Sequence, residues 1–299
     1  MEPRKYKTVL VGLGEIARHH RLGLQYSVLF ELSAVCDLKE DAPSKKYYVG
    51  IKFYTDVVEM LEKEKPRVAI LATPPSTHSV LAEICAKQNV LALIEKPLAA
   101  SMEEVTQMRT LLADNKINII YHWMFSQEIL WFKRSVRIRN LQKIHFQMED
   151  PYTDKNGHIK PSRSFLGGCW IDSGVNALSV LSLWTDLSHL EKKKIEHIKD
   201  AGIPVETHAE FTVDGVEVVM DISWRTGRNY KETSLQIGEE EYVLEHSNQR
   251  VLCNGEEIFS DQSMDRLDRH YYNFYCLYPS SLVSVKTTDR IHQVLMGNL

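Results

Sequence analysis

Short apolar runs alternate with amphipathic stretches along the first 121 residues of the chain. Runs of four or five mostly β-branched or aliphatic residues predict strands over 8–11, 32–36, 68–72, 90–94 and 117–121. The amphipathic stretches between them predict helices over 15–26, 57–63, 76–87 and 102–115. Ser76 and Ser101 are the predicted N-caps of the last two, and Glu104 completes a capping box with Ser101. Such an alternation is typical of a doubly wound parallel sheet.

After about residue 122, longer runs appear in which apolar and polar residues alternate. They predict strands over 143–149, 208–213, 216–224, 234–237, 241–246 and 251–253. Asp214-Gly215 and Asn254-Gly255 predict hairpin turns, and helices are expected over 172–183, 264–282 and 287–296. The pattern therefore predicts two domains: an α/β domain over residues 1–121, and an α+β domain with a largely antiparallel open sheet over residues 122–299. Packing of the C-terminal helices back on the first domain is left open.

Composition excludes several classes of protein. The chain of 299 residues has a net charge of -4, which gives no basic footprint for a nucleic acid. Its five cysteines are scattered without a CxxC pair, so we expect reduced thiols and a cytoplasmic protein. The basic N-terminus is followed by an apolar run that breaks at Gly12, too short for a signal peptide or a membrane span.

A glycine-rich segment, Gly12-Leu13-Gly14-Glu15-Ile16-Ala17, follows the first predicted strand and opens a helix. Its first glycine permits a tight turn, and its second lets the backbone approach a pyrophosphate at the helix N-terminus. Asp37 ends the second strand about 20 residues later, where an acid hydrogen-bonds a ribose diol and repels a 2′-phosphate. We therefore predict a dinucleotide-binding Rossmann domain that takes NAD or NADP. Asp37 slightly favours NAD, whereas Lys39, Lys45 and Lys46 would suit NADP.

The tripeptide Glu95-Lys96-Pro97 ends the fourth long apolar strand. Open α/β sheets place their chemistry at the carboxyl ends of strands. Lysine is a cation whose pKa shifts readily on burial, and the following proline restricts Lys96 to extended geometry. Lys96 is therefore a candidate catalytic residue. Glu95 has an equally supported structural interpretation, in which it pairs with a nearby cation.

Two strand ends, Ala72-Thr73-Pro74-Pro75 with His78 and the segment from Val90 to Pro97, resemble the glucose-fructose oxidoreductase / inositol dehydrogenase (Gfo/Idh/MocA) family. The resemblance implies hydride transfer between nicotinamide and a sugar. It also implies that the cofactor is bound by Gly12, Gly14, Glu15, Ile16, Ala17, Asp37, Thr73, Pro74, His78, Glu95 and Lys96.

In the second domain, Gly167-Gly168 followed by Asp172 matches the family's catalytic helix, but Asn176 stands where the family normally has histidine. The segment around Asn176, with Trp224-Arg225-Thr226-Gly227 and residues 269–277, is similar to the L-arabinose and D-galactose 1-dehydrogenase branch. One part departs from that branch. The loop over 151–165 lacks the branch's histidine- and tryptophan-bearing sequence, so the identity of the sugar does not carry over.

Asp172 and Asn176 stand four residues apart and project from one helix face. Oxidation of a carbinol requires the hydroxyl proton to leave, and an amide cannot take it. Lys96 and Asp172 therefore remain as proton acceptors, with the choice between them open, and Asn176 fixes the sugar by a hydrogen bond. His122 and Trp123 are weaker candidates for substrate contact, since a satisfied polar residue at a strand end or a core aromatic is the more common explanation. His145, His208 and His246 lack ligand spacing, so no metal is predicted.

Three hypotheses of function remain. The first is an NAD(P)-dependent dehydrogenase that acts at C1 of an aldose or a sugar derivative. The second is a reductase or dehydrogenase of another small polyol, sugar derivative or diol, which the altered loop keeps open. The third is a dinucleotide-binding sensor without catalysis, against which the retained Lys96 and Asp172 argue. The expected partner is a small-molecule sugar, and the family resemblance implies that the exposed face of the second sheet is a candidate surface for a homodimer.

Overall fold

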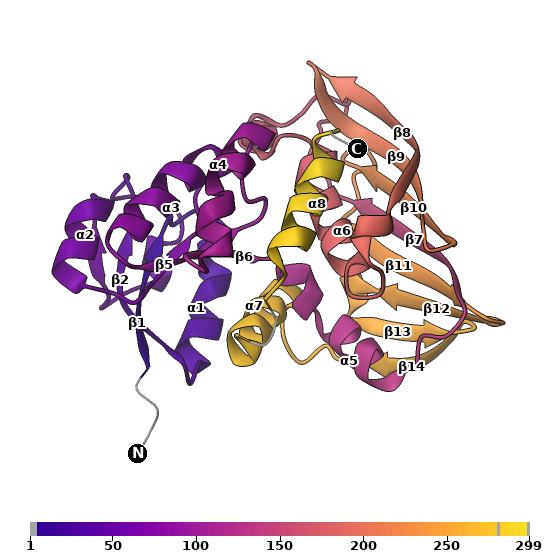
Figure 1. Cartoon of the computed structure of the whole chain (residues 1–299), viewed down its shortest axis with the longest axis horizontal. Helices are drawn as coiled ribbons and strands as arrows, with labels where there is room; N and C mark the ends of the chain where they lie inside the picture. Colours follow the sequence, from indigo (N-terminus) through magenta and orange to yellow (C-terminus); the bar gives the residue numbers. More distant parts are fainter. Residues whose placement is uncertain (1–4, 280–281, 298–299) are drawn as a thin grey trace. The chain divides into compact units, whose positions relative to one another are not determined.

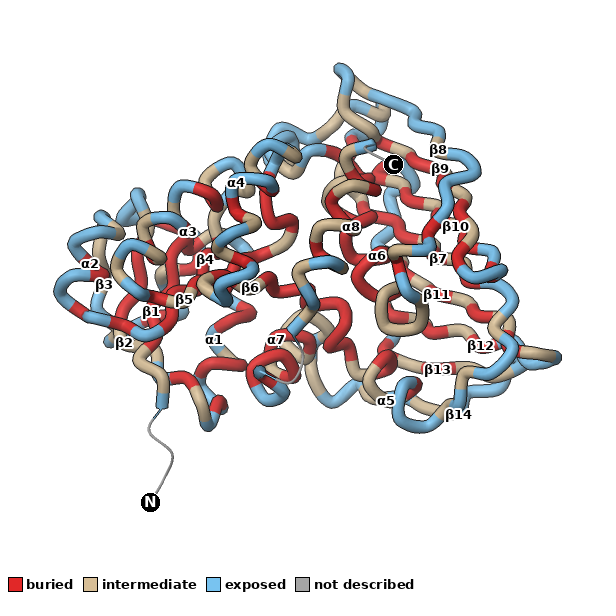
Figure 2. Tube along the Cα trace, viewed as in Figure 1, coloured by how far each residue is buried: buried red, intermediate tan, exposed pale blue. Residues whose placement is uncertain are grey.

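The computed structural model describes residues 5–279 and 282–297. The chain divides into two compact units. The first comprises Met1–His122 with Leu267–Thr288, and the second comprises Trp123–Arg266 with Asp289–Leu299. Figure 1 traces both along the chain, and Figure 2 marks their buried segments.

The first unit is built on a six-stranded parallel sheet with the order β3-β2-β1-β4-β5-β6. All five predicted strands agree with the structure to within two residues at each end, and β5 begins one residue later than predicted and includes Glu95. The prediction of a doubly wound sheet is confirmed, and only the short β3 was missed. The strands are β1 (Tyr6–Val11), β2 (Phe30–Cys36), β3 (Lys52–Tyr54), β4 (Val68–Leu71), β5 (Leu91–Glu95) and β6 (Ile117–Ile120).

Strand order reverses between β1 and β4, whose chains leave the sheet at adjacent carboxyl ends. This is the switch point where open α/β sheets bind ligands. The central strands β4 and β5 are almost fully buried, with all four residues of β4 inside, which explains their continuous apolar sequences. The sequence therefore places its glycine-rich turn at the crevice of the sheet.

Helices α1 (Ala17–Tyr26), α2 (Val57–Glu64), α3 (His78–Lys87) and α4 (Met102–Ala113) connect these strands. The predicted capping box is confirmed, because Ser101 Oγ accepts from the Glu104 N–H and the Glu104 side chain accepts from the Ser101 N–H. The prediction that Ser76 caps α3 is wrong. A short 3-10 turn over Pro75–Thr77, begun by the proline, occupies that position and leaves Thr77 before the helix.

Most of α7 (Arg266–Leu277) belongs to the first unit and packs on α1. A Cβ atom at Gly23 of α1 would lie 2.3 Å from Tyr275 Cδ2 and 2.8 Å from the Tyr271 carbonyl oxygen. Only glycine fits this close helix approach. Tyr271 and Tyr275 are fully buried there.

The second unit is built on an eight-stranded sheet with the order β14-β13-β12-β11-β7-β10-β9-β8. Neighbouring strands are antiparallel except β7 and β10, which are parallel. The prediction of a largely antiparallel sheet is confirmed. The strands are β7 (Leu141–Glu149), β8 (Glu191–Asp200), β9 (Ile203–Val213), β10 (Val216–Ser223), β11 (Tyr230–Ile237), β12 (Glu240–Glu245), β13 (Arg250–Cys253) and β14 (Glu256–Ser260).

Both predicted hairpin turns are present. Asp214 and Gly215 have φ of 51° and 84°, and Asn254 and Gly255 have φ of 50° and 85°. Positive φ at both central residues is the type I′ geometry that these dipeptides favour. The edge strands β8 and β14 were missed, because β8 carries lysines in place of an alternating apolar pattern.

Helices of the second unit include α5 (Gln127–Ser135) and α6 (Val175–Leu181), while α8 (Val285–Leu295) carries residues of both units. The predicted helix over 172–183 begins as a π-helical segment, Trp170–Gly174, before it continues as α6. Such wide turns are often found at functional sites. Across the described residues, no helix combines the length and apolar character that a membrane crossing requires.

Candidate active site

The glycine-rich turn after β1 has the geometry that the motif predicts. Gly12 has φ of +90°, and its N–H donates to the Cys36 carbonyl oxygen at 2.8 Å. A Cβ atom at Gly12 would lie 2.4 Å from the Ala72 carbonyl oxygen, so a side chain cannot fit. At Gly14, by contrast, a Cβ atom would meet no described atom within 4 Å. The turn therefore leaves open space in front of Gly14, where the predicted pyrophosphate would lie.

The residues after Gly14 lead directly into α1. Ile16 stands at the N-cap position with helical angles, and Ala17 is fully buried as the first residue of the helix. Glu15 is exposed at the turn. The backbone N–H groups at this helix N-terminus are suited to phosphate, so the residues present fit a dinucleotide.

Asp37 closes this turn from the end of β2. One carboxylate oxygen accepts from the Leu13 N–H at 2.7 Å, and the other accepts from the Lys39 N–H at 2.9 Å. The carboxylate is thereby fixed beside the glycine-rich turn, as recognition of a ribose diol requires. Of the nearby lysines, Lys45 directs its ammonium group onto the Phe53 ring at 3.8 Å.

The two strand ends that carry the family resemblance are tied together by His78. Its Nε2 lies 2.9 Å from the Thr73 carbonyl oxygen, and its Nδ1 lies 3.1 Å from the carbonyl oxygens of Pro97 and Leu98. Burial lowers the pKa of His78, and the surrounding carbonyl groups oppose that shift only partly. His78 thus braces the loop after β4, including Pro74, against the loop after β5. Its contact with a cofactor remains a prediction.

Glu95 is 5% exposed at the end of β5. Tyr271 donates its hydroxyl hydrogen to the carboxylate at 2.7 Å, and His20 Nε2 lies 3.1 Å from the same oxygen. Burial and the neighbouring Glu95 carboxylate raise the pKa of Tyr271 well above its ordinary value. These partners support the structural interpretation of Glu95. Lys96, the next residue, is half-buried at the strand end.

His122 and Trp123 fall in different units, although they are adjacent in the chain. His122 is 4% exposed, stacks on Tyr271 and places Nδ1 3.1 Å from Nδ1 of His270. Trp123 is 2% exposed and meets His246 edge to face. Both therefore have packing roles, and their contact with substrate remains a prediction.

In the second unit, a pair of glycines positions the predicted catalytic helix. Gly168 has φ of +101°, and a Cβ atom there would lie 2.8 Å from the Pro204 carbonyl oxygen at the start of β9. The Asp172 N–H then donates to the Gly168 carbonyl oxygen at 3.0 Å. The absence of a side chain at Gly168 thus allows the helix to begin against the sheet.

Asn176 lies one turn beyond Asp172, as predicted from their spacing. Its amide nitrogen reaches the Asp172 carbonyl oxygen at 3.4 Å, and the residue is only 6% exposed. Its Oδ1 atom is buried without a hydrogen-bond partner among the described residues. A buried amide oxygen that lacks a donor costs free energy, so this atom is suited to a ligand hydroxyl.

Sequence reasoning missed a buried charged pair beside this helix. Lys231 Nζ lies 2.6 Å from Asp150 Oδ1, and both side chains are less than 10% exposed. Ser173, adjacent to Asp172, donates to the other oxygen of Asp150 at 3.2 Å. Burial lowers the pKa of Lys231, while Asp150 and Asp172 oppose the shift. The only sequence signal was a lysine in an otherwise alternating strand, and its partner is 81 residues away.

The departing loop, residues 151–165, is held by hydrogen bonds within the second unit. Thr153 Oγ1 donates to the Trp224 carbonyl oxygen at 2.9 Å, and Lys160 Nζ donates to the Pro151 carbonyl oxygen at 2.6 Å. Arg163 lies over the Tyr152 ring. The loop thus has a defined conformation without the sequence of the sugar dehydrogenase branch.

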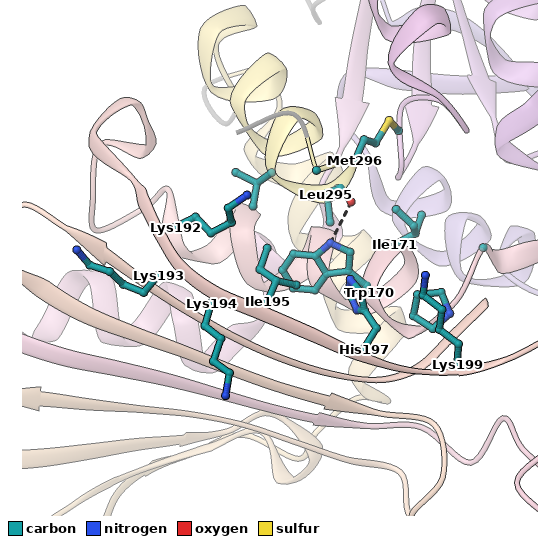
Figure 3. A pocket seen from close by; sticks show the side chains of 14 residues that line it. Trp170, Ile171, Lys192, Lys193, Lys194, Ile195, His197, Lys199, Leu295 and Met296 are labelled. Carbon is teal, nitrogen blue, oxygen red and sulfur yellow. Dashed lines mark hydrogen bonds between the residues drawn. The ribbon is translucent and has the colours of Figure 1, made fainter. Parts of the chain in front are cut away.

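A pocket of about 440 Å³ lies beside the π-helical segment Trp170–Gly174, between β8 and the end of α8. Trp170 forms part of its wall and donates its indole N–H to the Leu295 carbonyl oxygen at 3.0 Å (Figure 3). Lys192 and Lys199 lie at its rim with His197, whose pKa is lowered by burial and by Lys199. None of the predicted catalytic residues lines this basic pocket.

The predicted site residues thus form two groups. The first unit brings together the glycine-rich turn, Asp37, and the strand ends that carry Thr73 and Lys96. The second unit brings together Asp172 and Asn176 and adds Asp150, Lys231 and Ser173.

Comparison with known proteins matches the first group to one family. Residues 6–122 match the model GFO_IDH_MocA, an oxidoreductase family with an NAD-binding Rossmann fold. The rhizopine catabolism protein MocA of Rhizobium meliloti is 27% identical over 182 residues, covering 58% of this chain and 55% of that protein. Myo-inositol 2-dehydrogenase of Thermotoga maritima is 26% identical over 174 residues, covering 56% and 51%. The matched stretch spans about half the length of these relatives.

Solved structures match nearly the whole chain. The UDP-N-acetylglucosamine 3-dehydrogenase GnnA from Acidithiobacillus ferrooxidans superposes with a TM-score of 0.79 at 15% identity, covering 99% of this chain and 97% of that chain. An oxidoreductase from Agrobacterium radiobacter in complex with NAD+, L-tartaric acid and magnesium gives 0.76 at 12% identity, covering 98% and 94%. At such identities the similarity shows the fold alone.

Proposed function

We propose that this chain is a member of the Gfo/Idh/MocA oxidoreductase family, whose model matches residues 6–122, and that it transfers a hydride between a nicotinamide cofactor and a sugar. Its reacting carbon is C1 of an aldose or of a sugar derivative. The observation that carries this proposal is Asn176, one helical turn from Asp172, whose buried Oδ1 receives no hydrogen bond from any residue that the structure describes. A hydroxyl group of the substrate would supply that donor.

The cofactor half of the proposal rests on the first unit. The space in front of Gly14 and the fixed carboxylate of Asp37 suit a dinucleotide with a free ribose diol. Of the three lysines that would favour a 2′-phosphate, Lys45 is held on Phe53 and Lys46 lies over the Tyr47 ring. These contacts favour NAD over NADP. Bound nicotinamide would supply the hydride acceptor.

The chain's own residues handle the proton. As the carbinol C–H bond gives up its hydride, the hydroxyl proton passes to Lys96 or to Asp172, and Asn176 holds a neighbouring hydroxyl by its amide. Lys231 and Ser173 fix Asp150 beside the helix, so Asp150 offers acceptor oxygens to the sugar. An anomeric hydroxyl suits this arrangement because it is more acidic than an ordinary alcohol.

The test is Lys96→Ala, with Lys87→Ala as the matched control. Lys87 is an exposed helical lysine whose partner is Glu83. With an aldose panel and NAD, we expect Lys96→Ala to lose turnover by about a hundredfold or more, as removal of a general base does, while NAD still binds in calorimetry. The Lys87→Ala enzyme should behave as the unmodified chain. Ordinary turnover by Lys96→Ala would exclude Lys96 as the proton acceptor and leave Asp172.

A polyol other than an aldose is the second candidate, and the different loop over residues 151–165 favours it. The same assay extended to polyols separates the two, while NAD binding without turnover on any of them would indicate a silent sensor.

For the homodimer, we propose the half-buried open face of the sheet around His145 and Val219 as the contact. Light scattering of the purified chain tests it, and a monomeric mass would exclude it.

A further inference from the structure

A second pocket of the second unit, of about 380 Å³, is lined almost entirely by polar side chains. It lies where β11 begins and where β12 passes into β13, and α7 begins at its edge. Its walls carry the amides of Asn229, Asn248 and Gln249, the Ser247 hydroxyl, and the charged groups of Asp265 and Arg266. Its volume lies within the range of small-molecule sites.

Two of its polar atoms are buried and lack hydrogen-bond partners among the described residues. One is Oε1 of Gln249, a residue that is 6% exposed and uses its Nε2 to donate to the Met264 carbonyl oxygen at 2.8 Å. The other is Nη1 of Arg266. An unmade hydrogen bond at a buried polar atom is costly, so a pocket that keeps two of them is suited to a ligand.

Nη1 of the Arg266 guanidinium group has no hydrogen-bond partner in the part of the chain that the structure describes. The guanidinium carbon lies 5.7 Å from the Trp123 ring centroid, and burial lowers the pKa of Arg266 against the opposing effect of Asp150, Glu128 and Asp265. Asp150 pairs with Lys231, and Glu128 pairs with His246. Nη1 therefore remains available to a carboxylate brought by a ligand, for which a planar guanidinium is the preferred partner.

The remaining groups define the rest of the ligand. Gln249 Oε1 needs a donor, and the neighbouring amides and hydroxyl both donate and accept, which suits a row of hydroxyl groups. Asp265 adds a negative charge at the wall, so a dianion such as phosphate is disfavoured relative to a monoanion. We propose that this pocket binds a sugar acid, a polyhydroxylated monocarboxylate.

The pocket is connected to the catalytic helix by hydrogen bonds. Its Asn229 side chain accepts from Lys231 Nζ, which also bonds to Asp150, and Asp150 accepts from Ser173 next to Asp172. The sugar acid is therefore assigned as the substrate class of the oxidoreductase. This assignment rests on the proposed function, whereas binding in the pocket does not.

The experiment compares two matched hexoses on the full chain by calorimetry, with and without NAD. D-galacturonate and D-galactose differ only in the carboxylate, and inorganic phosphate serves as the competing anion. We expect galacturonate to bind roughly tenfold or more tightly than galactose, as a charge-assisted hydrogen bond provides, and phosphate to bind more weakly than galacturonate. Equal affinity for the two hexoses, or tighter binding of phosphate, overturns the proposal.

Variants locate the effect. Arg266→Gln should abolish the preference for galacturonate. Arg266→Lys should lose most of that preference, because lysine lacks the planar guanidinium group that binds a carboxylate through two hydrogen bonds. Arg225→Gln should keep the preference. Arg225 is an exposed arginine of the same unit that pairs with Glu206. Asp265→Asn should improve phosphate binding. Circular dichroism verifies the fold of each variant. If both Arg266 variants still prefer galacturonate to galactose, the proposal that this pocket binds the carboxylate is wrong.

Turnover separates the two proposals. Galacturonate binding without NAD reduction on any sugar would refute the oxidoreductase and leave the pocket in place. Turnover of neutral aldoses with no preference for their acids would refute the assignment and leave the oxidoreductase standing.

Discussion

The two units differ in how their side chains support the candidate site. In the first unit, two side chains beside the glycine-rich turn and the strand ends bond to backbone: Asp37 accepts from the N–H groups of Leu13 and Lys39, and His78 joins the carbonyl groups of two loops. In the second unit, side chains bond to each other, as in Lys231 with Asp150. The first arrangement follows from a local motif, whereas the second exists only after distant strands have come together.

Buried carboxylates show the same contrast. Glu64 in the first unit is 3% exposed, yet its partners Lys7 and Lys52 have side chains that are 43% and 69% exposed. Asp150 in the second unit pairs with a lysine whose side chain is only 6% exposed. The first ion cluster opens to solvent and is screened, while the second is enclosed. Removal of the lysine should therefore have very different consequences in the two units.

The largest effect is expected for Lys231→Met. It leaves Asp150 buried without its cation, which typically costs about 3–5 kcal/mol of the free energy of unfolding. Lys52→Met, the matched change beside Glu64, should cost about 0–1 kcal/mol because that lysine is exposed. Urea denaturation of both variants measures the difference.

A double variant separates the lost ion pair from lost packing. Lys231→Met combined with Asp150→Leu removes both charges and should recover most of the stability of the unmodified chain. Equal losses in Lys231→Met and Lys52→Met would show that the enclosed and open carboxylates do not differ.

These contrasts explain how much the sequence could predict. The glycine-rich turn was predictable because Gly12 and Gly14 act through backbone geometry that a short motif specifies. The helix with Asp172 and Asn176 was predictable from spacing, although its π-helical start was not. Asp150 and Lys231 were missed because they meet through β7 and β11, and strand pairing is not encoded locally. Gln249 and Arg266 were also missed as candidate site residues, because the pocket that they line forms only when distant segments meet.

A pH-dependent effect of intermediate size is expected at Glu64. Hydrogen bonds from Lys52 and Lys7 lower the pKa of Glu64 from 4.5 to about 2. A lowered carboxyl pKa stabilises the folded chain above pH 4.5, and this stabilisation is lost as the pH falls from 4.5 toward 2. Because the lysines are exposed, Glu64→Gln should cost about 2 kcal/mol at pH 7. Denaturation should show that the difference in the free energy of unfolding between the unmodified chain and Glu64→Gln is smaller at pH 3 than at pH 7. An equal difference at both pH values would exclude this origin.

The smallest effect compares two serines at helix N-caps, one in each unit. Ser101 completes the capping box of α4, so Ser101→Ala should cost about 1 kcal/mol. Ser126 precedes α5 without a side-chain cap, and its buried Oγ has no hydrogen-bond partner among the described residues. Ser126→Ala removes that unsatisfied hydroxyl and should leave stability unchanged or raise it slightly. Thermal unfolding of both variants decides the comparison: a larger loss at Ser126 than at Ser101 would mean that its hydroxyl is bonded after all.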